Sequence, residues 1–136
     1  MNDIRFEVPG SPVGAVRMTQ RSKWKPPAQR YLAYREAVGW AARAVCSEPL
    51  PGAVSIHITI FVVGDPMQRS VRRWDLSNVL KAVEDGCNGI CYADDFQVCS
   101  ESASIVDCAG YADEPSVRVH VAQLCTEPPA QLLRNP

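Results

Sequence analysis

Histidine is scarce in this chain, with two in 136 residues, and none of the six cysteines belongs to a Cys-x-x-Cys pair. This argues against a structural zinc site, whose cysteine and histidine ligands come at short spacings. No apolar run approaches the ~18 residues of a membrane span. The N-terminal MNDIRFEVPG lacks the basic start and apolar block of a signal peptide. We therefore expect a cytoplasmic protein whose reduced cysteines act as small apolar residues.

A large net charge is also missing, because the formal value is −1 at pH 7. This argues against a protein that coats DNA through bulk positive charge, but it leaves room for a local basic patch around an acidic centre. With 46% hydrophobic residues, the chain is expected to form one domain over residues 1–125. The polar, proline-rich residues 126–136 are expected to be a poorly ordered tail.

Hydrophobic periodicity indicates an α+β fold. It places strands at 4–8, 53–63, 96–106 and 116–124, a short strand at 89–92, and helices at 29–46 and 76–87. The first strand, helix and strand are compatible with a parallel crossover. The last two strands, joined by a turn-rich segment, are predicted to form an antiparallel hairpin. The expected architecture is a single mixed sheet of about four strands, on which two main helices pack.

The buried face is marked less clearly in the first helix than in the second. In 29–46 the residues at helical spacing are mostly alanine, with Leu32 and Trp40 among them. We expect Trp40 to lie in the core. In 76–87 one side of the helix is clearly apolar, and it consists of Leu76, Val79, Leu80, Val83 and Cys87.

The opposite side of the second helix carries Asn78, Lys81 and Asp85, and Asp75 precedes its first turn. Each of these residues is compatible with a plain structural role. Asp75 is at a position where an aspartate caps backbone N–H groups. Lys81 and Asp85 are spaced as an i,i+4 surface pair, and Asn78 as a solvated helix residue.

An adjacent acidic pair, Asp94 and Asp95, precedes the next strand. Adjacent carboxylates repel each other and strands disfavour aspartate, so either a turn or a bound cation is needed to explain the pair. Carboxylates without nearby histidine or cysteine ligands favour Mg²⁺ or Mn²⁺. We expect Asp75 and Asp95 to converge on such an ion beside Lys81, whose side chain leans toward the helix start. Those are the components of metal-assisted phosphodiester hydrolysis.

Positive charge is concentrated in the long loop before the first helix and in the segment before the second. The candidate DNA-binding residues are Arg17, Arg21, Lys23, Lys25, Arg69, Arg72 and Arg73. Each is equally compatible with solvated loop charge. Trp24 and Trp74 are candidates to stack on unpaired bases or to wedge a junction, with burial in the core as the alternative.

The segment WDLSNVLKAVEDGCNGICYADDFQV resembles the RusA family of Holliday junction resolvases. In that family a D-x-D-N-x-x-K helix is followed by a D-A-L-N-G-type helix end and a D-D-x-Q-[VI] segment. The matching residues are Asp75, Asn78, Lys81, Asp85, Asn88, Gly89, Asp94, Asp95, Gln97 and Val98. The order of the elements agrees as well, so the resemblance covers residues 4–124.

The resemblance implies a RusA-like homodimer that cuts four-way DNA junctions with Mg²⁺ or Mn²⁺, in bacteria and their prophages. The catalytic set carried over from the family is Asp75, Lys81 and Asp95. Asp94 is a further candidate metal ligand, and Ser77, Asn78 and Asp85 are supporting residues.

One position departs from the family pattern, because the second aspartate of D-x-D-N is Ser77 here. A serine cannot supply the missing charge. Asp94 or Asp85 then compensates, a water fills the position, or metal affinity and activity are low. We favour an active enzyme with a modified metal site. Two alternatives stay open: a junction-binding protein that has lost catalysis through Ser77, and a metal-free interaction domain whose acidic residues are caps and turns.

Overall fold

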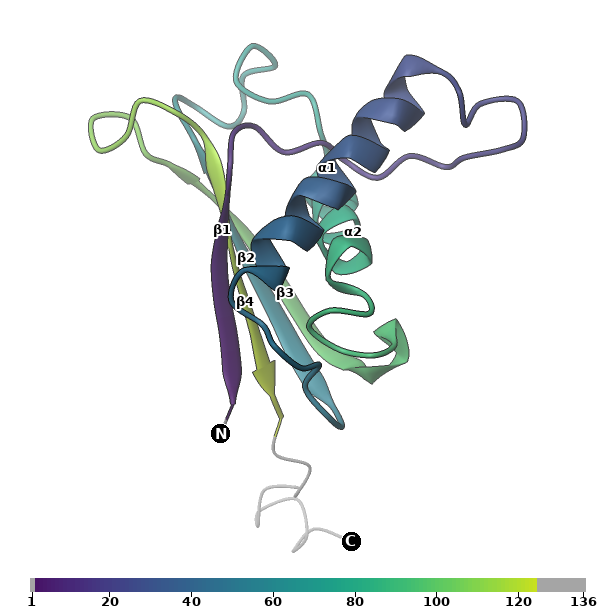
Figure 1. Ribbon diagram of the computed structural model, residues 1–136. Coiled ribbons are helices and arrows are strands. Elements are labelled where there is room, and N and C mark those ends of the chain that lie inside the picture. The colour runs from purple at the N-terminus through teal and green to yellow at the C-terminus, as the bar shows by residue number, and fades with distance from the viewer. Residues whose placement is uncertain (1, 125–136) are drawn as a thin grey trace, which may run out of the picture.

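The computed structural model describes residues 2–124, and the tail predicted at 126–136 lies outside them. In chain order the elements are β1 (Asp3–Pro9), α1 (Pro26–Arg43), β2 (Val54–Val62), α2 (Leu76–Cys87), the short 3-10 helix η1 (Asp95–Gln97), β3 (Val98–Asp107) and β4 (Ser116–Gln123) (Figure 1). The predicted α+β architecture is confirmed, with one four-stranded mixed sheet and two main helices. No helix within the described residues is long and apolar enough to cross a membrane.

The strand order of the sheet is β1-β4-β2-β3. β4 pairs antiparallel with both β1 and β2, whereas β3 pairs parallel with β2. The predicted hairpin of the last two strands is therefore wrong, because β2 lies between them. Alternation shows that a segment is a strand, but it does not show which neighbour the strand pairs with. The short strand predicted at 89–92 is also wrong, since this segment forms a turn with isolated bridges only.

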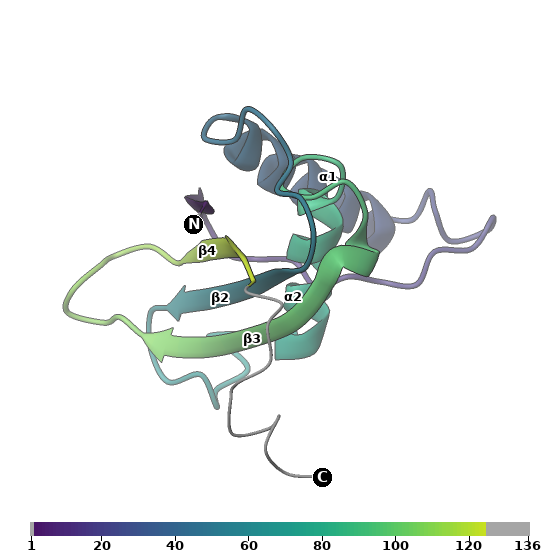
Figure 2. The same ribbon diagram turned by 90° about the horizontal axis from the view of Figure 1, so that it is seen from below.

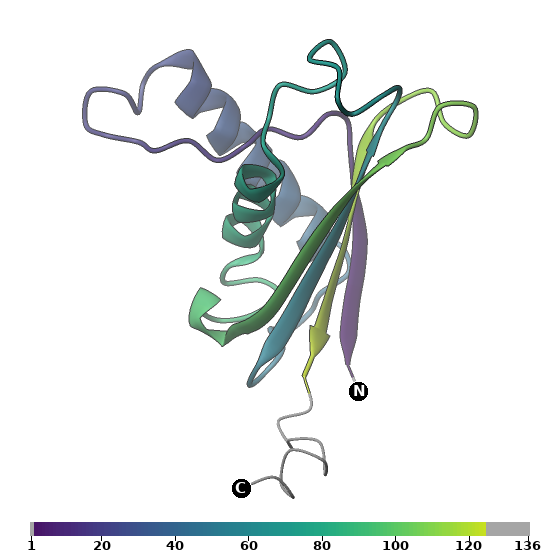
Figure 3. The same cartoon turned by 180° about the vertical axis from the view of Figure 1, so that it is seen from behind.

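Both helices cover one face of the sheet and leave the other face open (Figures 2 and 3). The alternation of β2 explains this arrangement. Ile56, Ile58 and Ile60 are buried beneath the helices, whereas His57 is exposed on the open face. Burial of each such isoleucine contributes roughly 1.5–3 kcal/mol to folding.

The bounds of α1 differ from the prediction by one turn. The helix begins at Pro26 instead of Gln29 and ends at Arg43 instead of Cys46. Two prolines open it, and proline suits the first helical turn because no N–H is needed there. The loop that precedes α1 is correspondingly shorter than expected.

The buried face of α1 is not the predicted one. Tyr31, Tyr34 and Val38 face the core, whereas Trp40 is 62% exposed and its predicted place in the core is wrong. Alanine occurs on several sides of this helix, so its spacing did not distinguish the faces. The two tyrosines, which the prediction left out, decide the orientation.

α2 has the predicted bounds and the predicted apolar face. It crosses α1 at Gly86, where a Cβ would lie 2.7 Å from the Cβ of Val38 and 2.9 Å from the carbonyl oxygen of Arg35. Glycine therefore permits a close approach of the two helices. This contact fixes α2, and with it the polar face of α2, relative to α1.

The described cysteines are free thiols. Cys87, Cys91 and Cys108 are buried, which confirms the expectation for these three positions. Cys46 is partly exposed, and Cys99 is exposed on β3, where the expectation of burial is wrong. β3 is an edge strand, and the residues through which it packs against the core are Val98, Ala103 and Ile105.

Candidate active site

The polar face of α2 is open to solvent over its first two turns. Ser77, Asn78 and Lys81 are all exposed. Asp75 occupies the N-cap position of α2 and is exposed, but its side chain makes no capping hydrogen bond. The carboxylate of Asp75 therefore does not cap the start of the helix, which weakens the interpretation of this residue as a plain cap.

The loop between β1 and α1 docks on this first turn. The backbone N–H of Ala15 donates to the carbonyl oxygen of Asn78 at 2.9 Å. A Cβ at Gly14 would lie only 3.1 Å from the Cβ of Asn78, so a glycine lets the loop come close. The main chain of Asn78 thereby joins α2 to the loop that carries four of the seven candidate DNA-binding residues. The supporting role of its side chain stays a prediction.

The acidic pair lies in the turn that forms η1. Asp94 is the N-cap of η1 and accepts from the backbone N–H of Phe96 at 3.0 Å. Gln97 completes the capping box, since its Oε1 accepts from the backbone N–H groups of Ala93 and Asp94 at 2.8 and 3.1 Å. The role of Asp94 as a turn residue is therefore clear, whereas Asp95 is exposed and caps nothing.

Gln97 also ties this turn to the body of the protein. Its Nε2 donates to the carbonyl oxygens of Leu50 and Gly52, each at 2.8 Å. The sequence comparison matched Gln97 to the RusA pattern but gave it no role. The structure supplies one, which is to hold the position of Asp95.

Neighbouring negative charge acts on Asp95. A hydrogen bond with Asp94 raises the pKa of Asp95, and the charges of Asp94 and Asp85 raise it further, whereas Lys81 lowers it. The pKa of Asp94 is lowered instead, mainly by the backbone N–H of Phe96. Asp95 thus lies in a negative field in which a cation would be favoured.

Two acidic residues beside Asp95 were missed in the sequence. Glu84 on α2 and Glu101 on β3 line a shallow hollow together with Asp95. Burial and a hydrogen bond with Glu101 raise the pKa of Glu84 to about 8. A signal was present, because Glu101 has the same strand parity as the partly buried Ala103 and so faces the helices.

Asp85 has a structural partner in α1. The hydroxyl of Tyr31 donates to its Oδ2. Burial and this carboxylate raise the pKa of Tyr31 to about 12. Asp85 therefore helps to hold the two helices together.

Asp75 and Asp95 do not converge within one chain. Asp75 begins α2, whereas Asp95 follows the turn beyond the opposite end of the helix (Figure 1). The helical rise alone puts about 15 Å between Asp75 and Asp85, and the pKa of Asp95 responds to Asp85. Within residues 2–124 no group of three or more acidic, histidine or cysteine side chains is placed to hold a metal ion. The expected approach of the two carboxylates does not occur in a single copy.

A basic hollow of about 190 Å³ adjoins Asp75, and Arg69, Arg72 and Arg73 line it. Arg72 is engaged in the loop itself, because it donates to two loop carbonyl oxygens at 2.7 and 2.9 Å and stacks on Trp74 with its guanidinium 5.5 Å from the ring centre. Trp74 packs against the core, which favours the core interpretation for this tryptophan. Arg69 and Arg73 are exposed beside Asp75.

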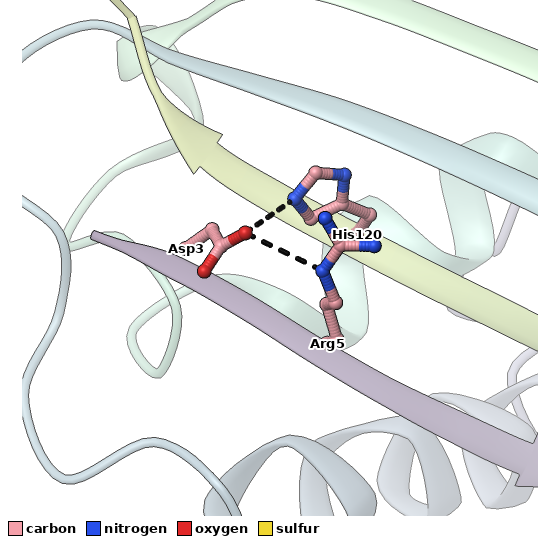
Figure 4. Close-up of polar contacts among 3 residues, drawn as sticks. All are labelled: Asp3, Arg5 and His120. Atoms are coloured by element: carbon pink, nitrogen blue, oxygen red, sulfur yellow. Dashed lines mark hydrogen bonds and ion pairs between the residues drawn. The ribbon is translucent and has the colours of Figure 1, made fainter. Parts of the chain in front are cut away.

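A separate polar cluster lies on the open face of the sheet. Oδ2 of Asp3 accepts from Nε2 of His120 at 3.1 Å and from Nε of Arg5 at 3.3 Å (Figure 4). His120 pairs across the strands with His57, and both line a hollow of about 410 Å³. This face is opposite to α2, so the hollow is not part of the candidate site.

Comparison with known families agrees with the motif on α2. The family model of endodeoxyribonuclease RusA matches residues 9–122 of the 136. The matched region starts at the end of β1, runs into β4, and includes α2 and the acidic turn. No curated protein matches the chain.

Proposed function

This chain belongs to the RusA family of endodeoxyribonucleases, and from that membership we propose that it resolves four-way DNA junctions by metal-dependent phosphodiester hydrolysis as a homodimer. The observation that carries the proposal is the family match over nearly the whole described chain. The same proposal puts the protein in the cytoplasm of a bacterium, with the gene on the chromosome or in a prophage.

The available donors suit a hard divalent cation. Asp75 and Asp95 are exposed carboxylates, and neither is used as a helix cap. Mg²⁺ needs only one or two protein carboxylates, because water and phosphate oxygens complete its coordination. When bound, Mg²⁺ or Mn²⁺ would supply a water of lowered pKa and would polarise the phosphate. Asp94 is a weaker candidate ligand because its carboxylate already caps η1.

The other residues have roles that follow from their charge and place. Lys81, exposed in the middle of α2, would stabilise the negative charge that develops on the phosphate. Arg69 and Arg73 would hold the DNA backbone beside Asp75. Asp85, through Tyr31, and Gln97 would keep α2 and the acidic turn in position.

A homodimer would bring the two separated carboxylates together. Around a twofold axis perpendicular to α2, two copies of the helix run antiparallel. The start of one then lies beside the end of the other, and Asp75 of one copy can meet Asp95 of the second. The symmetry produces two equivalent sites, which suits a substrate with near-twofold symmetry. The exposed polar face of α2 supports this arrangement, because the side chains of Asn78 and Lys81 are open to solvent within the described residues.

A mixing experiment tests both the chemistry and the arrangement. Asp75→Asn and Asp95→Asn variants, each alone, should lose Mg²⁺-dependent cleavage of a labelled synthetic four-way junction. A heterodimer of the two, co-expressed with different tags, should regain one intact site and nick one strand of the symmetric pair. Asp113→Asn, in the exposed β3–β4 connection, is the matched control and should cleave normally.

The possible outcomes separate the parts of the proposal. An inactive heterodimer beside an active wild type would refute the shared site. Cleavage that persists in Asp95→Asn would refute the assignment of the acidic turn. Absence of junction cleavage by the wild type with either Mg²⁺ or Mn²⁺ would refute the nuclease.

A second candidate function rests on Ser77. This exposed residue, in the first turn of α2, stands where the family pattern has an aspartate. A protein with too little negative charge at that turn would bind branched DNA without cutting it. Tight junction binding with no nick under Mg²⁺ or Mn²⁺ would support this candidate.

A further inference from the structure

The loop before α1 projects from the body of the protein beyond the start of α1, on the helix side of the sheet (Figures 1 and 3). No aspartate or glutamate occurs between Glu7 and Glu36. The cations of this interval are Arg17, Arg21, Lys23, Lys25, Arg30 and Arg35. The chain has a net charge of −1, so this projection is a strong local departure from the average.

Trp24 lies in this cationic projection and is 74% exposed. The ammonium of Lys23 lies 5.2 Å from the centre of its ring. A large apolar side chain left in water on a positive projection has no evident role in the fold. Its chemistry is that of a platform on which a nucleic-acid base can stack, with phosphates held by the neighbouring cations.

The backbone around Trp24 is held by local hydrogen bonds. Thr19 and Ser22 bond reciprocally, each backbone N–H donating to the other hydroxyl, at 2.7 and 3.1 Å. The backbone N–H of Lys25 donates to the carbonyl oxygen of Ser22 at 3.0 Å, and Nε2 of Gln29 donates to that of Lys23 at 2.7 Å. Trp24 thus lies in an ordered turn that leads directly into α1. Binding therefore costs little additional conformational entropy in this segment.

The other two tryptophans do not have this combination. Trp74 packs against the core. Trp40 is exposed, but its indole N–H donates to a carboxylate oxygen of Glu36 at 3.4 Å, and that negative charge would repel a phosphate. Among the three, only Trp24 is exposed within a stretch of sequence that has cations and no acidic residue.

We propose that Trp24 stacks on a base unpaired at the branch point of a four-way DNA junction. The inference rests on the proposed function and adds a residue that selects branched over linear DNA. In a linear duplex every base is already stacked and paired, so Trp24 has no partner there. The cations around it contribute to both substrates, because phosphates are present in both.

The test compares Trp24→Ala with Trp40→Ala, which removes another exposed tryptophan, near the other end of α1. Affinities for a synthetic four-way junction and for a linear duplex of equal length are measured over a range of salt concentrations. Trp24→Ala should weaken junction binding roughly tenfold, leave duplex binding unchanged, and leave the slope of log K against log salt unchanged. Lys23→Ala should weaken the binding of both substrates. It should also make the slope of log K against log salt shallower by the contribution of about one phosphate contact.

Trp24→Phe should retain most of the junction preference, because a phenyl ring still stacks. Equal junction affinity of wild type and Trp24→Ala would overturn the inference, as would an equal loss in Trp40→Ala. Failure of the proposed function would be recognised separately, because the wild-type protein would then neither bind the junction more tightly than the duplex nor cleave it. Circular dichroism and the urea midpoint should be the same for all variants, because both tryptophans are exposed.

Discussion

Replacement of Glu84 by glutamine should flatten the pH dependence of stability. Glu84 on α2 faces Glu101 on β3, with Asp85 adding negative and Lys81 positive charge nearby. Burial and the hydrogen bond with Glu101 raise the pKa of Glu84 from 4.5 to about 8. The folded chain therefore keeps a proton that the unfolded chain has already released. Folding takes up a proton in this range, so stability falls as the pH rises from 4.5 to about 8.

The size of the effect follows from the shift. A rise from 4.5 to about 8 corresponds to about 4.8 kcal/mol at about 1.36 kcal/mol for each pKa unit. Glu84 is partly exposed and solvent screens its interactions, so we expect roughly 2 kcal/mol. Glutamine has the same shape and still donates toward Glu101, but it does not ionise. The difference in free energy of unfolding, Glu84→Gln minus wild type, should increase by about 2 kcal/mol from pH 5 to pH 8.5.

Urea titrations at several pH values, followed by tryptophan fluorescence in EDTA, measure this difference directly. EDTA removes any bound metal that would otherwise change the charge of the site. Glu114→Gln, in the exposed β3–β4 connection, is the matched control and should follow the wild-type pH curve. Parallel curves for wild type and Glu84→Gln would refute the shared proton between α2 and β3.

Three further predictions concern packing, thiol access and metal binding. Gly86→Ala should lower the free energy of unfolding by about 1–3 kcal/mol in urea, because the new Cβ would lie 2.7 Å from Val38; an unchanged midpoint would contradict the close helix crossing. Cys99 should react with Ellman's reagent in the native protein well before the buried Cys87, and equal rates would contradict the exposure of β3. Ser77→Asp should lower the Mg²⁺ concentration needed for half-maximal junction cleavage, whereas an unchanged metal titration would exclude Ser77 from the ligand positions.

The sequence predicted α2 and β2 well because their patterns are one-sided. The apolar residues of α2 occupy a single face, and those of β2 alternate through its whole length. α1 was harder, since alanine packs against a core or faces water at little cost. The orientation of α1 depends on Tyr31 and Tyr34, whose rings are buried although each carries a hydroxyl.

Strand pairing and the assembly of the site depend on contacts between distant parts of the chain. The alternation of β3 and β4 says nothing about whether β2 lies between them. The spacing from Asp75 to Lys81 predicted correctly that both lie on or beside the polar face of α2. The distance from Asp75 to Asp95 was not predictable in the same way, because it depends on the direction of α2 relative to the following turn.

The central place of β4 has a consequence for biosynthesis. While the ribosome is still adding the residues of β4, β1 has no strand with which to form hydrogen bonds, since among the described strands it pairs with β4 alone. A nascent chain that stops before Ser116 therefore leaves β1 detached and one long edge of β2 bare. Premature termination late in the message would yield an aggregation-prone fragment instead of a shortened nuclease.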